Sequence, residues 1–225
     1  MYKRGYIYKG LKPVYWCPHD ETALAEAEIE YQDDPCTTVY VKFPMKDDLG
    51  KLSQFDLSHT FFVIWTTTAC TLPGNRAISV NPEFTYALMK VESGETYIVA
   101  KDLAEAVAKN AGIETYEIIA ELPGSELELM TAQHPLMDQE SVVLCGDHVT
   151  LDAGSGCVHT APGFGADDFN ICQKYDKAGL THIGVPVPVN AKGVMTDERF
   201  NGVHISKAND YVLPALEAVS YTHLT

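Results

Sequence analysis

Apolar and polar positions alternate in many short runs along the chain, and these runs predict a protein built mainly from strands. Residues that are β-branched or aromatic dominate the runs, and such residues favour extended backbone. Clusters of Gly, Pro and charged residues separate the runs and predict turns. Many short strands with a few helices are typical of a mostly β, α+β domain. The predicted strands cover residues 37–43, 59–68, 85–91, 96–100, 116–122, 127–130, 142–145 and 156–160.

A few segments show the helical spacing of apolar residues instead. The clearest of them is followed by Gly112, a C-terminal stop, and the last is interrupted by Pro214. Residues 22–31 fit either a helix or an alternating strand. The predicted helices cover residues 101–111, 168–178 and 206–216.

The composition is that of a globular protein with reduced thiols. The chain has 225 residues, enough to bury one sizeable core, and 46% of them are hydrophobic. No apolar run approaches the roughly 20 residues that span a bilayer, and the first residues lack the apolar core of a signal peptide. The six cysteines are scattered without a C-x-x-C pair, which argues against a zinc site or a disulfide framework. These features predict a cytoplasmic protein that does not bind membranes.

The charge balance limits the class of partner. A net charge of −15 argues against broad, non-specific binding of nucleic acid, and so against a DNA-binding protein. Any contact with RNA would have to be local or be supported by parts outside this chain.

Polar chemistry concentrates in residues 151–169, which read L-D-A-G-S-G-C-V-H-T-A-P-G-F-G-A-D-D-F. A predicted strand delivers His159 to a glycine-containing loop, and Asp167 and Asp168 stand just beyond, where a helix begins. Glycines permit close approaches that a side chain would block, so this arrangement can form the floor of a polar pocket. The alternative is a tight strand-to-helix connection in which the two acids cap the helix and meet its dipole. The residues of this stretch alone favour the alternative.

A second polar cluster, Thr66, Thr67 and Thr68, stands at the end of a predicted strand. Successive side chains of a strand point to opposite sides, and hydroxyls both donate and accept hydrogen bonds. The cluster suits a pocket that holds a water and an ester or amino group, although threonine is also common in strands for structural reasons. Asn75, a few residues later, fits equally a turn residue or a polar contact at a pocket.

Other catalytic signatures lack support. The triplet Gly154-Ser155-Gly156 matches neither a nucleophile elbow nor a phosphate-binding loop. Cys157 and His159 face the same side of a predicted strand, but no third group that would orient a Cys–His pair is evident.

Two long signatures resemble the isoleucyl-tRNA synthetases. The first is W-T-T-T-A-C-T-L-P-G-N-R-A-I-S-V-N-P at residues 65–82, and the second is G-D-H-V-T-L-D-A-G-S-G-C-V-H-T-A-P-G-F-G-A-D-D-F at residues 146–169. The matching region of that family is the editing domain inserted into its class I catalytic domain, a barrel-like fold. Valyl and leucyl relatives usually carry T-T-R-P at the threonine stretch, so T-T-T favours the isoleucine family.

The resemblance also implies how the chain is divided. Residues 1–35 would link to the catalytic domain, residues 36–205 would form the editing domain, and residues 206–218 would return toward the catalytic domain. Residues 219–225 look like a non-native tail, and we expect the chain to be a fragment of a longer enzyme.

The implied activity is hydrolysis of valine mischarged onto isoleucine tRNA. An apolar synthetic pocket discriminates one methylene by only about 1 to 3 kcal/mol, for which isoleucine and valine are the standard example, so a second site must clear the error. The resemblance implies that Asp168 binds the α-ammonium group, which suits a charge-assisted hydrogen bond. It implies that Thr67 and Thr68 line the amino-acid pocket and help to place the water, and that His159 blocks the larger side chain. The implied substrate-binding residues are Thr66, Asn75 near the terminal adenosine, Gly163 and Gly165.

The same resemblance implies the partners. The expected partner is the acceptor end of tRNA(Ile) carrying valine, and we expect a monomer with no metal or cofactor in this segment. ATP and Mg²⁺ would serve only a synthetic domain, because the chain has no complete H-I-G-H and no K-M-S-K-S. Two alternatives stay open: a valyl-type editor that clears threonine from tRNA(Val), and a non-catalytic module that binds a tRNA acceptor end.

The chain departs from the family pattern at two places. Phe164 stands where a histidine is usual, and Ala69-Cys70 stands where P-W is usual. Both departures could alter loop packing or the contact with tRNA.

Overall fold

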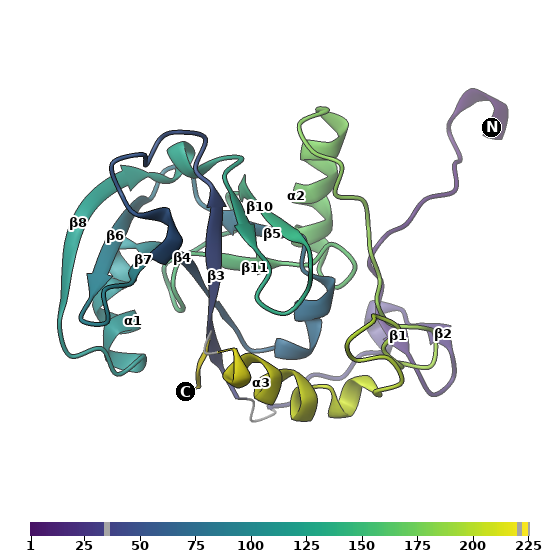
Figure 1. Cartoon of the computed structure of the whole chain (residues 1–225). Helices are drawn as coiled ribbons and strands as arrows, with labels where there is room; N and C mark the ends of the chain where they lie inside the picture. Colours follow the sequence, from purple (N-terminus) through teal and green to yellow (C-terminus); the bar gives the residue numbers. More distant parts are fainter. Residues whose placement is uncertain (34–36, 220–221, 225) are drawn as a thin grey trace.

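The structure is a computed structural model of the chain, and it describes residues 1–33, 37–219 and 222–224 (Figure 1). Its centre is a sheet in which six strands close on themselves to form a barrel. Going round the barrel, the strands are β3 (Val39–Asp47), β9 (Thr131–Gln133), β10 (Glu140–Cys145), β5 (Ala77–Val80), β11 (Val158–Thr160) and β4 (Thr60–Thr66). Pairing of β3 with β4 completes the ring.

The barrel mixes parallel and antiparallel pairs. Strand β5 runs parallel to β10 and antiparallel to β11, whereas β11 runs parallel to β4. The carboxyl ends of β4 and β11 therefore lie at the same edge. The register sets His159 opposite Ile78 and Val158 opposite Trp65.

A second layer extends the barrel from β4. The first residues of β4 pair with β7 (Thr96–Ala100), which continues into β6 (Thr85–Val91) and β8 (Tyr116–Pro123). Helix α1 (Ala104–Asn110), which follows the 3-10 turn η5 (Lys101–Leu103), packs on this layer. Ala104, Val107 and Ala108 of the helix belong to the same buried apolar cluster as Met89 and Val99 of the strands.

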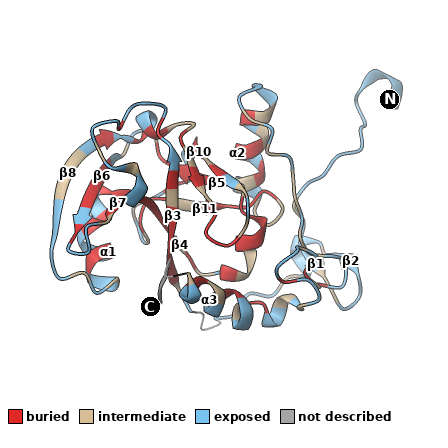
Figure 2. Ribbon diagram, in the orientation of Figure 1, coloured by how far each residue is buried: buried red, intermediate tan, exposed pale blue. Residues whose placement is uncertain are grey.

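The strands of the barrel are largely buried (Figure 2), and most of their buried apolar side chains belong to one core cluster. Phe43, Phe62, Ile64 and Ile78 are completely buried there. Burying one such side chain stabilises the fold by about 1.5 to 3 kcal/mol. Leu72 joins the same core from the 3-10 turn η4 (Ala69–Gly74), so the connection between β4 and β5 is held by packing.

Helix α2 (Ala166–Lys177) packs against the outside of the barrel through Ile171, Cys172 and Tyr175, which meet Leu144. The hydroxyl of Tyr175 accepts a hydrogen bond from the backbone N–H of Cys145 at 3.0 Å. This anchoring fixes the helix so that its first turn lies beside the end of β11.

The remaining elements are peripheral. The N-terminal segment extends away from the barrel and carries several exposed aromatic side chains (Figures 1 and 2). It contains η1 (Tyr2–Arg4), the small sheet of β1 (Trp16–Cys17) with β2 (Thr22–Ala23), and η2 (Glu26–Glu28). Short 3-10 turns η3 (Leu57–His59), η6 (Gly124–Leu127) and η7 (Ile205–Lys207) connect other elements. Helix α3 (Asn209–Ala218) packs on the core through Val212 and Leu216.

Most predicted elements are confirmed, with three corrections. The strand predicted at residues 127–130 is wrong, because η6 ends at Leu127 and Leu129 has a φ of 64°, which no strand accommodates. Strand β5 was not predicted, because A-I-S-V is buried on both sides and shows no alternation. Residues 22–31 form neither a helix nor one long strand, but β2 followed by η2.

The segment set aside as a tail is partly placed in the structure. Its residues 222–224 form β12 (Thr222–Leu224), which pairs antiparallel with residues 39–41 of β3, while residues 220, 221 and 225 lie outside the described residues. No helix of the described part of the chain is long and apolar enough to cross a membrane.

Candidate functional site

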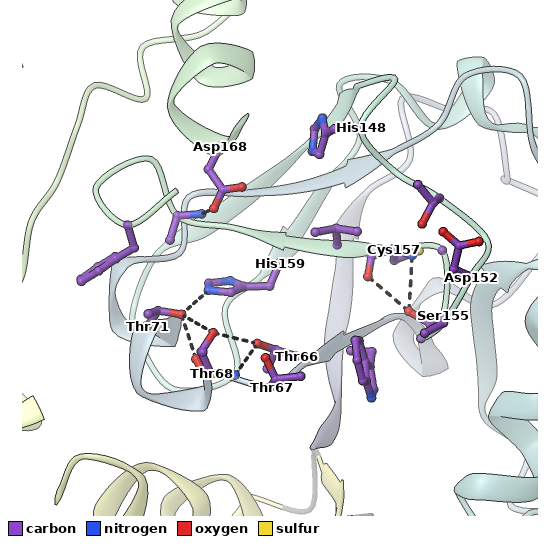
Figure 3. Close-up of a pocket in the computed structure, with 18 residues that line it drawn as sticks. Thr66, Thr67, Thr68, Thr71, His148, Asp152, Ser155, Cys157, His159 and Asp168 are labelled. Carbon is purple, nitrogen blue, oxygen red and sulfur yellow. Dashed lines mark hydrogen bonds between the residues drawn. The ribbon is translucent and has the colours of Figure 1, made fainter. Parts of the chain in front are cut away.

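A cavity of about 460 Å³ opens where the ends of β4 and β11 meet the first turn of α2 (Figure 3). Two stretches that are distant in the sequence, one after β4 and one around β11, supply its walls. Its lining comprises residues 65–68, Thr71, His148, Thr150, residues 152–159, Ala161, Phe164 and Asp168. The structure thus brings the two clusters of the sequence, the threonines and the 151–169 stretch, into one site.

Asp168 is the carboxylate of this site. It stands in the first turn of α2, half-buried, and its Oδ2 accepts a hydrogen bond from the backbone N–H of Ala161 at 2.8 Å. Burial raises the pKa of Asp168, whereas the Ala161 N–H and the nearby His148 oppose that rise. Asp167 is exposed and does not line the cavity. Of the two predicted acids, only Asp168 therefore lines the cavity.

The three threonines lie on the cavity wall where β4 ends, as Figure 3 shows: Thr66 is the last residue of the strand, and Thr67 and Thr68 follow it. Strand β4 ends at Thr66, whose hydroxyl accepts a hydrogen bond from the backbone N–H of Thr68 at 3.1 Å. The hydroxyl of Thr68 lies 3.4 Å from that of Thr66 and 3.5 Å from that of Thr71. Among the described residues, Thr67 takes no part in this network, although it lines the cavity beside it.

His159 forms another wall of the cavity and is buried. Its Nε2 lies 3.0 Å from the hydroxyl of Thr71, and its Nδ1 lies 2.7 Å from the side-chain nitrogen of Asn75. Burial lowers the pKa of His159 to about 3, and the nearby His134 adds to this effect. The imidazole is therefore neutral at physiological pH. Because protein groups occupy both ring nitrogens, His159 is suited to shaping the cavity and not to accepting a proton.

Three predicted substrate contacts stand behind the cavity surface. Asn75, Gly163 and Gly165 are absent from the lining formed by the described residues. Asn75 is completely buried below His159. A Cβ on Gly163 would lie 2.5 Å from the carbonyl oxygen of Pro186, and one on Gly165 would lie 3.0 Å from Cγ of Asp168. Both glycines are therefore closely packed against neighbouring residues, and a direct contact with substrate stays a prediction for all three.

The structure adds residues that sequence reasoning missed. Thr71, which belongs to the first signature but has no role implied by the resemblance, places its hydroxyl 3.0 Å from Nε2 of His159. His148 lines the cavity, and its buried Nε2 has no hydrogen-bond partner among the described residues. Ser141 on β10 is connected to the site indirectly: its hydroxyl donates a hydrogen bond to Oδ1 of Asn75 at 2.5 Å. Because the two residues are far apart in the sequence, only the pairing of the strands brings them together.

The two departures from the family pattern lie near this site. Phe164 lines the cavity, and its ring packs so closely on Gly74 that a Cβ there would lie 2.5 Å from the ring. Ala69 is buried in the barrel core, and Cys70 packs against that core. Phe164 is thus the departure that changes the wall of the cavity itself.

Comparison with known proteins identifies the family. The sequence model of the tRNA synthetases class I (I, L, M and V) matches residues 1–202. The chain belongs to this family. The isoleucine–tRNA ligase of Caldanaerobacter subterraneus subsp. tengcongensis is 53% identical over 216 residues, which cover 94% of this chain and 22% of that protein. The chain thus spans about a fifth of the length of this curated relative of the class I synthetases.

Solved structures agree with the observed architecture. The chain is similar to GlLeuRS-CP1, with a TM-score of 0.68 and 18% identity over 82% of this chain and 97% of that one. It is also similar to the editing domain of the P. knowlesi cytosolic leucyl-tRNA synthetase, with a TM-score of 0.67 and 13% identity over 86% of this chain and 97% of that one. The predicted barrel-like editing fold of class I synthetases is therefore confirmed.

Proposed function

We propose that this chain hydrolyses the ester bond of valine mischarged onto isoleucine tRNA, as the proofreading part of an isoleucine–tRNA ligase. The observation that carries the proposal is one cavity that joins the Asp168 carboxylate to the threonine wall. The family and the editing fold support the same activity, since its relatives are isoleucine–tRNA ligases.

Asp168 binds the α-ammonium group of the substrate. Its Oδ2 is engaged by the Ala161 N–H, which leaves Oδ1 for the ligand. A charge-assisted hydrogen bond of this kind contributes about 1.5 to 3 kcal/mol. The amino group therefore fixes which way the aminoacyl ester enters the cavity.

The threonine wall places the hydrolytic water. Hydroxyls of Thr67 and Thr68 can each donate and accept, so they hold a water beside the ester carbon. The water oxygen bonds to the carbonyl carbon, the bond between that carbon and the ribose oxygen breaks, and a proton from the water passes to the ribose oxygen. The products are free valine and a tRNA with its terminal hydroxyl restored.

His159 supplies the size limit. Its ring is fixed at both nitrogens, so it cannot swing away when a larger side chain enters. Isoleucine carries one methylene more than valine, and overpacking a fixed wall costs about 1 to 3 kcal/mol. Discrimination by this wall adds to that of the synthetic pocket.

The test is release of amino acid from Val-tRNA(Ile) and Ile-tRNA(Ile) by the full chain and by Asp168→Asn. The wild-type chain should release valine and spare isoleucine, and the variant should lose about 10- to 100-fold in rate, the equivalent of the lost charge-assisted bond. Release of threonine from Thr-tRNA(Val) in place of valine would show a valyl-type editor instead.

A chimera provides the control for tRNA binding. Replacing the corresponding segment of a full-length isoleucine–tRNA ligase with this chain supplies the parts of the relative that this chain does not span. A chimera that binds tRNA but leaves Val-tRNA(Ile) intact would contradict the proposal and favour a non-catalytic module.

A further inference from the structure

A chain of hydrogen bonds runs behind the cavity wall and ends at His159. It starts at Ser141 on β10, passes through Asn75 after η4, and reaches the ring of His159 on β11. From His159 it continues to the hydroxyl of Thr71, which bonds the carbonyl oxygen of Thr68 at 2.8 Å. Ser141 and Asn75 are both completely buried. This series of hydrogen bonds therefore joins the barrel interior to the threonine wall of the cavity.

The surroundings of Asn75 fix the orientation of its amide. One side-chain atom lies 2.9 Å from the carbonyl oxygen of Ala77, which can only accept, so this atom is the nitrogen Nδ2. The other atom is then Oδ1, and it accepts the hydroxyl proton of Ser141 at 2.5 Å. A flipped amide would set two oxygens against each other at Ala77.

This orientation determines the proton on His159. The second proton of Asn75 Nδ2 points to Nδ1 of His159, so Nδ1 must carry a lone pair. The neutral ring then carries its proton on Nε2 and donates it to the Thr71 hydroxyl, whose own proton goes to Thr68. Each proton in this series of hydrogen bonds, from Ser141 to Thr68, therefore has one acceptor.

We propose that Ser141 and Asn75 are positioning residues that hold His159 as the Nε2–H tautomer and lock its ring as the wall of the cavity. Neither residue lines the cavity, so both act through His159. The proposal has two halves. The first, the tautomer of His159, does not depend on the proposed function. The second, that the locked ring limits the size of the side chain that enters the cavity, rests on the proposed function.

The first half is tested by nuclear magnetic resonance of the ring nitrogens of His159 in the full chain, with His159→Gln to assign the signals. Near neutral pH, Nδ1 should show the shift of an unprotonated nitrogen and Nε2 that of a protonated one. Asn75→Asp replaces the donor by an acceptor of the same shape, so it should move the proton to Nδ1. A wild-type ring protonated on Nδ1 would overturn the proposal, whether or not any variant folds.

A matched pair of serine variants separates positioning from general stability. Ser141→Ala removes the donor to Asn75, whereas Ser79→Ala removes an equally buried hydroxyl that bonds Thr160 at 2.7 Å and lies outside the chain of bonds. Ser141→Ala should broaden or shift the His159 nitrogen signals, and Ser79→Ala should leave them unchanged. Equal shifts in the two variants would overturn the role of Ser141.

The second half is tested by the ratio of valine to isoleucine release. Ser141→Ala should lower this ratio about tenfold, mainly through faster release of isoleucine, while Ser79→Ala keeps it. An unchanged ratio in Ser141→Ala, beside an altered ring signal, would overturn the size-limit role. Absence of valine release from the wild-type chain and the chimera would instead contradict the proposed function and leave the nitrogen spectra as the test of the tautomer.

Discussion

The carboxylate of Asp168 and the backbone of Ala161 are joined by a 2.8 Å hydrogen bond that links the first turn of α2 to the residue after β11. The bond aims the acid at the cavity instead of at the N–H groups of its own helix. Asp168 therefore has a structural role, accepting the Ala161 N–H, in addition to its proposed role of binding the α-ammonium group of the substrate. The two roles can be separated because only the second needs a negative charge.

Two variants of Asp168 should therefore differ in stability. Asp168→Asn keeps an oxygen that accepts from Ala161, so its free energy of unfolding should match or exceed that of the wild type. Asp168→Ala leaves the Ala161 N–H without its acceptor, which should lower that free energy by about 1 to 3 kcal/mol. Urea unfolding of the three proteins measures the difference, and an equal loss in both variants would contradict this role of the bond.

The stability gap between Asp168→Asn and the wild type should depend on pH. Burial raises the pKa of Asp168 in the fold above its value in the unfolded chain, so the folded protein keeps this proton over a pH range in which the unfolded chain has lost it. The stability that the protonated acid contributes is present below the unfolded pKa, and it is lost as pH rises through the folded pKa.

The wild type should therefore approach Asp168→Asn in acid and fall below it toward neutral pH. Unfolding curves for both proteins across that range test the sign. A gap that closed as pH rose would show that the carboxylate is stabilised, not penalised, by its surroundings.

Much of this site could be predicted from local sequence, and the rest depends on strand register. The threonines and the stretch around His159 can be recognised in the sequence as polar residues at the ends of predicted strands, and both line the cavity. Ser141 carries no such signal, since it is an ordinary strand residue until β10 sets it beside Asn75. Asn75 itself could be placed near the site but not behind His159, because burial is a property of the closed barrel.

Gly156 should be far less tolerant of alanine than Gly94. Both glycines have a positive φ, 76° and 88°, so both substitutions incur the strain of a left-handed residue, about 1 to 2 kcal/mol. A Cβ on Gly156 would also lie 2.3 Å from the Cβ of Ala100, whereas one on Gly94 meets nothing within 4 Å. Gly156→Ala should thus lower the free energy of unfolding more than Gly94→Ala does. Thermal or urea unfolding measures both. Equal losses of unfolding free energy in the two variants would show that the backbone around Ala100 shifts to accommodate the added Cβ.

Cys157 should be dispensable for hydrolysis, although it stands two residues before His159. Its Sγ donates to the carbonyl oxygen of Ile98 at 3.6 Å, and burial raises the pKa of the thiol strongly. A thiol acts as a nucleophile through its thiolate, which this environment disfavours. His159 cannot take the proton, because Asn75 and Thr71 occupy its two nitrogens.

Cys157→Ala should therefore keep most of the valine release of the wild type, and Cys157 should resist alkylation until the chain is unfolded in urea. Mass spectrometry of the peptide that carries Cys157, before and after unfolding, measures its protection. Cys172→Ala is the matched control, since Cys172 is equally buried but lies outside the cavity lining. Loss of release in a folded Cys157→Ala, with Cys172→Ala active, would instead indicate a covalent acyl intermediate on the Cys157 sulfur.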